Sequence, residues 1–133
     1  MNDVVELQIA GNGDVVAVRQ RVRTVAQEIG LSVVDQTKVV TAASELARNT
    51  VVYGGGGQVR IEVVSRGARR GLRLLFSDDG PGIADLAQAL TDGWSTGGGL
   101  GLGLSGSRRL MDEFDLTSEP GQGTRVTVTK WGR

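Results

Sequence analysis

The sequence predicts an α+β fold, a two-layer α/β sandwich in which helices cover one face of a single mixed, mainly antiparallel sheet. Three observations predict this fold. The chain has 133 residues, which suits one domain with its own core over residues 1–133. Two long segments in the first half have the apolar spacing of amphipathic helices, and five shorter segments have the pattern of strands. Helical and strand segments are grouped rather than strictly alternating, which favours an α+β sandwich.

The N-terminal segment is expected to form a strand followed by an amphipathic helix. Residues 4–9 are apolar or alternating, and the turn-forming residues 10–13 end this strand. Valine and isoleucine then recur every three or four residues from about 14 to 29, which is typical of a helix. Asp14 is the expected N-cap, and Gly30 is expected to end the helix. Three arginines lie on the other face, where a solvated surface and a partner-binding surface are both open interpretations.

A second helix and a β-hairpin are expected next. Ser32 has the features of a helix N-cap, and apolar residues line one side of the chain to about Tyr53. Four glycines then end the helix and are expected to form a connection without a chemical role. Residues 58–65 and 72–77 have the pattern of two strands, and residues 67–71 are the turn expected between them.

The last third of the chain is expected to hold two short helices and two strands. Residues 83–90 are predicted to form the first of these helices. A glycine-dense segment follows at 97–104, and Ser105 is the expected N-cap of the second helix. The final strands are expected at 114–118 and 124–130, joined by a turn that contains proline and glycine.

Composition excludes several classes of function. The formal net charge is zero, so nothing indicates nucleic acid or an anionic membrane as a partner. The chain has no cysteine and no histidine, which excludes thiol nucleophiles, the usual zinc sites and a phosphohistidine intermediate. It has no signal sequence and no apolar run of about 18 residues, so a cytoplasmic location is expected. Catalysis would use carboxylates, hydroxyls, lysine or arginine, or a hard cation held by oxygen ligands.

The glycine-dense segment is the most distinctive stretch of the sequence. Five of the eight residues from Gly97 to Leu104 are glycine, so backbone amides could converge on an anion where no side chains block them. A helix that begins at Ser105 would add its positive dipole end. No lysine follows a glycine, which excludes a Walker loop, and the position is wrong for a dinucleotide fingerprint. A flexible linker is the alternative.

Glu45 and Asn49 are candidates for phosphate chemistry on the second helix. They are four residues apart, so their side chains lie on one face of the helix. A carboxylate and a carboxamide offer the hard oxygen ligands that a phosphate-bound Mg²⁺ accepts. The carboxylate could also take the proton of an attacking hydroxyl or water. An exposed polar pair is the alternative interpretation.

Two glycine-containing turns complete the set of candidate motifs. Asp78 at a strand end could accept a hydrogen bond from an exocyclic amine such as that of adenine, and Gly80 and Gly82 would let a ring approach the backbone. An ordinary Asp-Gly turn is the alternative. The segment Gly121-Gln122-Gly123-Thr124 leads into the last strand, and alone it indicates only a β-turn.

Four motifs follow one another along the chain: the Glu45/Asn49 helix, the strand end at Asp78–Gly82, the glycine-dense segment and the turn before Thr124. In that chain order they resemble the N, G1, G2 and G3 boxes of the GHKL superfamily of ATPases and kinases, the gyrase, Hsp90, histidine kinase and MutL type. The resemblance implies the Bergerat fold, with ATP and Mg²⁺ as cofactors. It implies that Glu45 is the general base and that Asn49 is a Mg²⁺ ligand. The glycines from Gly97 to Gly103 would form a lid over the phosphates, and Thr124 would support the adenine through Asp78 and water. The implied nucleotide-binding residues are Asp78, Gly80, Gly82, Gly97, Gly98, Gly99, Gly101, Gly103 and Thr124.

Within that superfamily the chain resembles the small serine/threonine kinases of bacterial partner-switching modules, and those of the stressosome in particular. Residues 44–49, 94–96 and 109–114 carry this resemblance. It implies phosphorylation of Ser or Thr on STAS-domain scaffold and antagonist proteins, followed by activation of a PP2C-type phosphatase in general stress signalling. An anti-sigma factor with serine kinase activity and a nucleotide-gated binding module are the alternatives.

Overall fold

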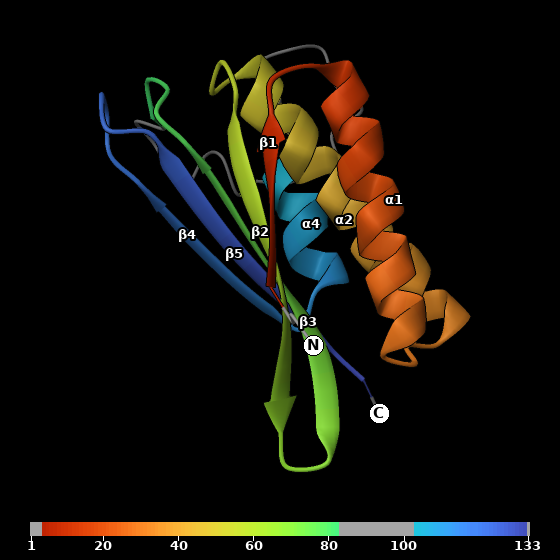
Figure 1. The fold of residues 1–133 in the computed structure, drawn as a ribbon. Helices are drawn as coiled ribbons and strands as arrows, with labels where there is room; N and C mark the ends of the chain where they lie inside the picture. The colour runs from red at the N-terminus through yellow and green to blue at the C-terminus, as the bar shows by residue number, and fades with distance from the viewer. Residues whose placement is uncertain (1–3, 83–102, 133) are drawn as a thin grey trace.

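The computed structural model describes residues 4–82 and 103–132, which form a two-layer α/β sandwich (Figure 1). In chain order, the elements are β1 (Val4–Ile9), α1 (Asn12–Glu28), α2 (Val33–Val52), β2 (Gly57–Arg66), β3 (Arg69–Asp78), α4 (Gly103–Leu110), β4 (Glu113–Ser118) and β5 (Thr124–Trp131). The three helices cover one face of the sheet, as the sequence predicts. The predicted helix at 83–90 and the glycines at 97–101 lie outside the described residues. None of the described helices is long and apolar enough to cross a membrane.

The sheet has the strand order β1-β2-β3-β5-β4. Every neighbouring pair of described strands is antiparallel, so the mainly antiparallel sheet is confirmed but its predicted mixed character does not hold for this part of the chain. The connection between β1 and β2 explains part of the difference. Two helices lie between these strands, so the chain returns to the end where β1 finished, and β2 runs back along it.

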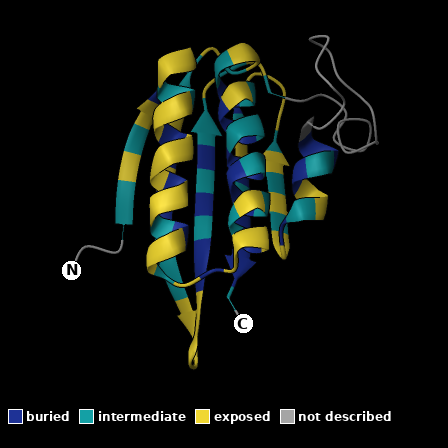
Figure 2. Cartoon of the chain, turned by 90° about the vertical axis from the view of Figure 1, so that its right-hand side faces the viewer, coloured by how far each residue is buried: buried dark blue, intermediate teal, exposed yellow. Residues whose placement is uncertain are grey.

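The core lies between the helices and the sheet, and it fixes the rotation of α2 about its own axis. Successive strand residues point to opposite faces, so one face of β2 and β3 is apolar. Eight residues of α2 are buried, compared with three of α1 (Figure 2). Leu46 and Ala47 lie in this core, and Glu45 and Asn49 are consequently held half-buried at its border.

Two helices begin earlier than the sequence predicts. Gly11 is the N-cap of α1, and Asp14 lies inside the first turn. Asp14 Oδ2 accepts hydrogen bonds from the backbone N–H groups of Ala10 (2.8 Å) and Gly11 (3.3 Å). The carboxylate thus stabilises the start of the helix from within rather than as its cap. Ser105 is likewise wrong as an N-cap, because α4 begins at Gly103.

The second helix starts as the sequence predicts. Ser32 is the N-cap of α2, and its Oγ accepts a hydrogen bond from the backbone N–H of Asp35 at 3.1 Å. This contact satisfies one of the free N–H groups of the first turn. The N-terminal end of α2 is therefore a well-defined point in the fold.

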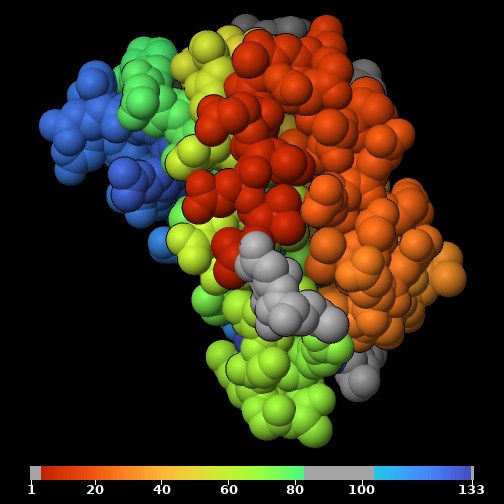
Figure 3. Space-filling model, in the orientation of Figure 1, coloured from red at the N-terminus to blue at the C-terminus, as the bar shows by residue number. Residues whose placement is uncertain are grey.

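The β2–β3 hairpin is longer than predicted and projects beyond the helices (Figure 3). Only Gly67 and Ala68 lie between the two strands, whereas the sequence suggested a turn over 67–71. Gly71 belongs to β3, opposite Trp131 in the register. A Cβ atom at Gly71 would come within 2.7 Å of the Trp131 ring. The glycine therefore makes room for the tryptophan and does not form the turn.

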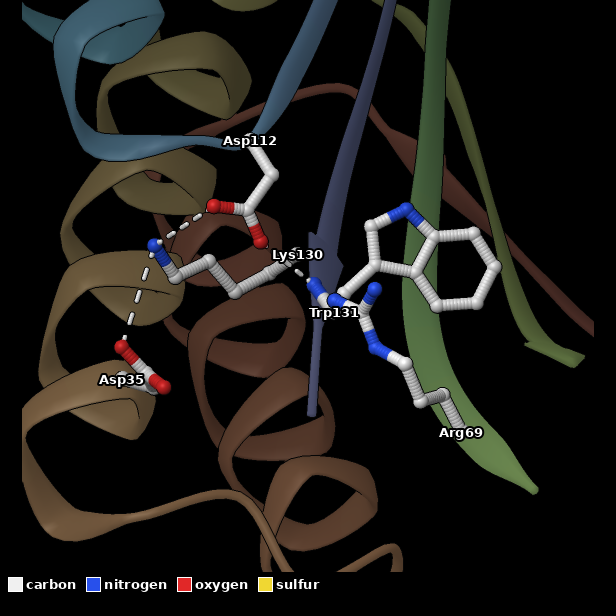
Figure 4. Close-up of a pocket in the computed structure, with 5 residues that line it drawn as sticks. All are labelled: Asp35, Arg69, Asp112, Lys130 and Trp131. Carbon is white, nitrogen blue, oxygen red and sulfur yellow. Dashed lines mark hydrogen bonds and ion pairs between the residues drawn. The ribbon is translucent and has the colours of Figure 1, made fainter. Parts of the chain in front are cut away.

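A buried lysine joins three parts of the fold at the end where α2 begins (Figure 4). Lys130 Nζ donates a hydrogen bond to the carbonyl oxygen of Leu110, the last residue of α4, at 3.1 Å. The same nitrogen lies 3.8 Å from Asp35 Oδ1 and 3.4 Å from Asp112 Oδ1. The side chains of Lys130 and Asp35 are only 7% and 8% exposed. Each of these two buried charges therefore depends on the other.

Replacing Lys130 with methionine is expected to lower the free energy of unfolding by about 2 kcal/mol, because it leaves the Asp35 carboxylate buried beside no cation. The expected cost is below that of a tight buried pair for two reasons. The side chain of Asp112 is 42% exposed, so water still solvates it without Lys130, and the N-terminus of α2 also stabilises the Asp35 carboxylate. Lys38→Met, at a partly exposed position of α2, is the matched control. Urea unfolding compares the two variants, and equal midpoints would contradict the expectation.

Candidate nucleotide-binding site

The candidate site lies at the end of the sheet where β3 and β4 finish and β5 begins. Asp78, the last residue of β3, is directly opposite Thr124, the first residue of β5. On its other side, Thr124 is opposite Ser118, the last residue of β4. The hydroxyl oxygens of Ser118 and Thr124 lie 3.0 Å apart. The sheet therefore brings the predicted residues Asp78 and Thr124 side by side from distant parts of the chain.

The loop after β3 is tied back to Asp78 and to the neighbouring turn. Asp78 Oδ1 accepts a hydrogen bond from the backbone N–H of Gly80 at 2.9 Å. The carbonyl oxygen of Pro81 accepts a hydrogen bond from Gly121 N–H at 2.7 Å. A backbone hydrogen bond therefore joins the loop after β3 to the turn before β5. Gly80 occupies only one carboxylate oxygen of Asp78, and the other has no hydrogen bond among the described residues.

The two predicted glycines of this loop allow close approach of other backbone segments. Gly82 has a φ of +78°, and a Cβ atom there would collide with the carbonyl oxygen of Glu119. A Cβ atom at Gly80 would come within 2.7 Å of the Gly54 Cα atom. These glycines thus have a packing role, which adds to their predicted role in shaping the wall beside adenine.

Gly54, just after α2, packs against Asp78 and Gly80 in the loop that follows β3. The sequence did not indicate this contact. The N–H of Gly54 lies 3.3 Å from the Asn49 carbonyl oxygen, and a Cβ atom at Gly54 would collide with the side chain of Asp78. The first glycine of the run at 54–57 is therefore more than a flexible connection. Its position five residues after Asn49, at the end of the helix, was the only signal in the sequence.

Gly121 and Gly123 offer a matched test of this packed turn. Both have positive φ angles, +79° and +82°, but only a Cβ atom at Gly123 would meet other atoms, where it would collide with the carbonyl oxygen of Asp78. Gly121→Ala is expected to cost about 1 kcal/mol for the left-handed backbone alone. Gly123→Ala is expected to cost about 2 kcal/mol more because of the collision. Urea unfolding measures both costs, and equal costs would contradict the described turn.

Glu45 and Asn49 present oxygen atoms from the C-terminal half of α2. Both residues are half-buried, and no hydrogen bond or ion pair to another described residue holds either side chain. They lie about 6 Å apart along the helix axis. A carboxylate and an amide oxygen in this state fit a Mg²⁺ that takes its remaining ligands from phosphate and water.

The helix that follows the predicted lid packs against α2. Gly103 is the first residue of α4, and the other predicted lid residues, Gly97, Gly98, Gly99 and Gly101, lie outside the described residues. Ser105 and Ser107 are buried, and α4 is in contact with α2. The chain after the glycine-dense segment is therefore fixed against the helix that carries Glu45 and Asn49.

Comparison with known proteins identifies the family of the chain. Residues 34–131 match the family model described as histidine kinase-, DNA gyrase B-, and HSP90-like ATPase. The serine/threonine-protein kinase RsbT of Bacillus subtilis (strain 168) is 49% identical over 133 residues, which cover all of both chains. An anti-sigma F factor of Clostridium novyi (strain NT) is 32% identical over 101 residues, which cover 71% of this chain and 69% of that protein.

Solved structures share the fold. The structure of the RsbU and RsbW domains of Rv1364c from Mycobacterium tuberculosis superposes with a TM-score of 0.70 at 22% identity, over 99% of this chain and 33% of that one. The mycobacterial sensor histidine kinase MprB superposes with a TM-score of 0.57 at 15% identity, over 97% of both chains. At these identities the likeness concerns the fold alone.

Proposed function

The chain belongs to the family of histidine kinase-, DNA gyrase B- and HSP90-like ATPases and is an ATP-dependent serine/threonine protein kinase, and we propose that its substrates are STAS-domain proteins. The acceptor is a Ser or Thr on a stressosome scaffold or antagonist protein. Once released from that substrate, the kinase binds and activates a PP2C-type phosphatase. The observation that carries this proposal is the 49% identity to the kinase RsbT over the full length of both chains.

The geometry at the end of the sheet supports the roles that we propose for the nucleotide-binding residues. Asp78 accepts a hydrogen bond from the adenine amine with the carboxylate oxygen that Gly80 leaves free. Thr124, directly opposite Asp78, supports this contact through water. Gly80 and Gly82 keep this wall narrow because they let the neighbouring backbones approach. The glycines from Gly97 to Gly103 contribute backbone amides over the phosphates.

The roles proposed for α2 concern the phosphoryl transfer itself. Mg²⁺, when bound, neutralises charge on the ATP phosphates. Asn49 would hold it through the side-chain carbonyl oxygen. Glu45 accepts the proton of the seryl or threonyl hydroxyl as that oxygen bonds to the γ-phosphorus and the bond to the β-phosphate oxygen breaks. The chain has no histidine, which excludes a phosphohistidine intermediate and fits direct transfer to the acceptor hydroxyl.

A second candidate function is that of an anti-sigma factor with serine kinase activity. The observation that favours it is the 32% identity to the anti-sigma F factor of Clostridium novyi over 71% of this chain. Such a protein would also phosphorylate a STAS-domain antagonist, but its main output would be a complex with a sigma factor. The two candidates therefore differ in the second partner and not in the chemistry.

The experiment that tests the proposal uses purified full-length chain with Mg·ATP and three cognate partners in turn, a STAS-domain protein, a PP2C-type phosphatase and a sigma factor. Mass spectrometry of the STAS-domain protein is expected to find one phosphorylated Ser or Thr. Isothermal titration is expected to detect binding to the phosphatase and none to the sigma factor. Binding to the sigma factor alone would favour the anti-sigma function instead.

A further inference from the structure

Arg48 is a charged residue beside the proposed active site that the proposed chemistry does not use. It lies on α2, three residues after Glu45 and directly before Asn49, and it is the only cation in the second half of this helix. The residue is exposed, and no hydrogen bond or ion pair joins its side chain to another described residue, Glu45 included. The guanidinium is therefore available to an anionic group from outside the chain.

The order of residues around α2 separates a core side from a solvent side. Successive residues of a helix are rotated by about 100°, so Asn49, Glu45 and Arg48 follow one another over an arc of about 100°. Leu46 lies about 60° beyond Asn49 on the opposite side and is buried in the core. Asn49 and Glu45 are half-buried, and Arg48 is exposed. The proposed metal ligand, the proposed base and Arg48 thus follow one another from the core to the solvent.

The nucleotide would reach this row of residues from the sheet. Asp78, the proposed adenine ligand, ends β3, and Figure 2 shows α2 with the sheet behind it and no described element in front of it. A nucleotide held at Asp78 therefore approaches α2 from the core side. In an in-line transfer, the acceptor hydroxyl attacks the γ-phosphorus from the side opposite to the leaving group. The acceptor consequently enters from the solvent side of Glu45, where Arg48 lies.

Val52 extends this surface by one helical turn. It is four residues after Arg48, so the two side chains are neighbours on the surface of the helix. Around the helix it lies between Glu45 and Arg48, and it is 54% exposed. A free cation and an apolar group therefore stand together beside the proposed base.

We propose that Arg48 and Val52, which we call the acceptor face, dock the segment of the substrate protein that carries the phosphorylated Ser or Thr. This inference rests on the proposed function, because it assigns substrate contacts of the same site. Before transfer, an unmodified segment offers an anion only as Asp or Glu, so Arg48 pairs with a carboxylate near the acceptor hydroxyl. Val52 packs against an apolar side chain of the same segment. Together the two contacts hold the hydroxyl beside Glu45 without touching ATP.

The test of Arg48 measures KM and kcat for phosphorylation of the cognate STAS-domain protein by the full-length chain at saturating Mg·ATP. Arg48→Gln is expected to raise KM about tenfold, the effect of losing a hydrogen bond to a charged group, with kcat within about twofold of the wild-type value. Arg70→Gln is the matched control. Arg70 is also exposed, but it precedes Asp78 on β3 by eight residues, which is about 26 Å along the strand. Its KM is expected to equal that of the wild type.

Val52 has a matched control on the same face of the same helix. Val34 is 63% exposed and lies 18 residues earlier, which is five turns or about 27 Å. Glutamine has a higher helix propensity than valine, so both Val52→Gln and Val34→Gln are expected to fold. Val52→Gln is expected to raise KM for the STAS-domain protein about fivefold, and Val34→Gln is expected to leave it unchanged.

Two further measurements separate docking from a structural role. ATP affinity and the slow hydrolysis of ATP without an acceptor are expected to be the same in Arg48→Gln and the wild type. The KM of the wild type is expected to rise between about 50 and 300 mM NaCl, because salt screens pairs of opposite charge, and that of Arg48→Gln is expected to rise less steeply. Arg48→Lys, which keeps the charge but not the fork of donors, is expected to have an intermediate KM.

The carboxylate that pairs with Arg48 can be identified on the substrate. Mass spectrometry locates the phosphorylated Ser or Thr, and each nearby Asp or Glu is then replaced by Asn or Gln. One replacement is expected to raise the KM of the wild type about tenfold and that of Arg48→Gln less than about twofold, because the pair is already lost in the variant. If no replacement depended on Arg48 in this way, the proposed pairing would be wrong.

Three other results would overturn the proposal. An unchanged KM in Arg48→Gln would remove this residue from the acceptor contact. A loss of ATP affinity, or a lower kcat at an unchanged KM, would place Arg48 at the nucleotide phosphates instead. Equal increases of KM in Arg48→Gln and Arg70→Gln would indicate a general effect of net charge. Failure of the proposed function is separately visible, because the wild-type chain would then transfer no phosphate to the STAS-domain protein.

Discussion

Glu45→Gln is expected to lower the rate of phosphoryl transfer about 10²- to 10⁴-fold and to leave ATP affinity within about threefold of the wild-type value. Glutamine has nearly the same size as glutamate but takes no proton from an attacking hydroxyl. Glu45 is half-buried on α2 without a partner among the described residues, so no ion pair of the fold is lost. Single-turnover transfer to the STAS-domain protein and fluorescence titration with ATP measure the two quantities separately.

The matched control for Glu45 is Glu28→Gln, which neutralises an exposed carboxylate near the end of α1. Its transfer rate is expected to equal that of the wild type. If Glu45→Gln lost ATP binding and transfer together, the residue would have a structural or nucleotide-binding role and would not be the general base.

Asp78→Asn is expected to weaken ATP binding about 30- to 100-fold, which is the value of a hydrogen bond to a charged acceptor. Asparagine keeps a side-chain oxygen for the hydrogen bond from Gly80 N–H, so the loop after β3 is expected to remain folded. Its amide group would present N–H donors where the adenine amine needs an acceptor. Calorimetric titration with ATP, in the presence of Mg²⁺, measures the loss.

Asp79→Asn is the control for this variant, because Asp79 is the next residue and is exposed, whereas Asp78 is half-buried. Its ATP affinity is expected to be unchanged. Similar losses in the two variants would mean that general negative charge near the loop matters and that Asp78 makes no specific contact with adenine.

The sequence was sufficient for the elements whose signals are local. Apolar spacing located α1 and α2, Ser32 marked the start of α2, and alternation located the strands of the sheet. Motif order also predicted that Asp78 and Thr124 belong to one site, and the register places them directly opposite each other. Each of these predictions depends on residues near one another in the chain or on a motif with a fixed geometry.

The features that the sequence did not indicate depend on contacts between distant segments. Gly71 resembles a turn residue, but it is needed because Trp131 lies over it from β5. Gly54 resembles part of a linker, but it packs against the Asp78 side chain. Lys130 resembles a surface lysine at the end of a strand, yet it is buried against Asp35. No local pattern distinguishes such residues from exposed ones.

Transfer of the labelled γ-phosphate from ATP to the cognate STAS-domain protein tests the central claim most directly. Purified chain, Mg²⁺ and γ-labelled ATP are expected to place the label on a Ser or Thr of the partner, with none retained on the kinase. Release of the label as inorganic phosphate, with an unlabelled STAS-domain protein and normal ATP binding, would contradict the assignment of this chain as a kinase of STAS-domain proteins.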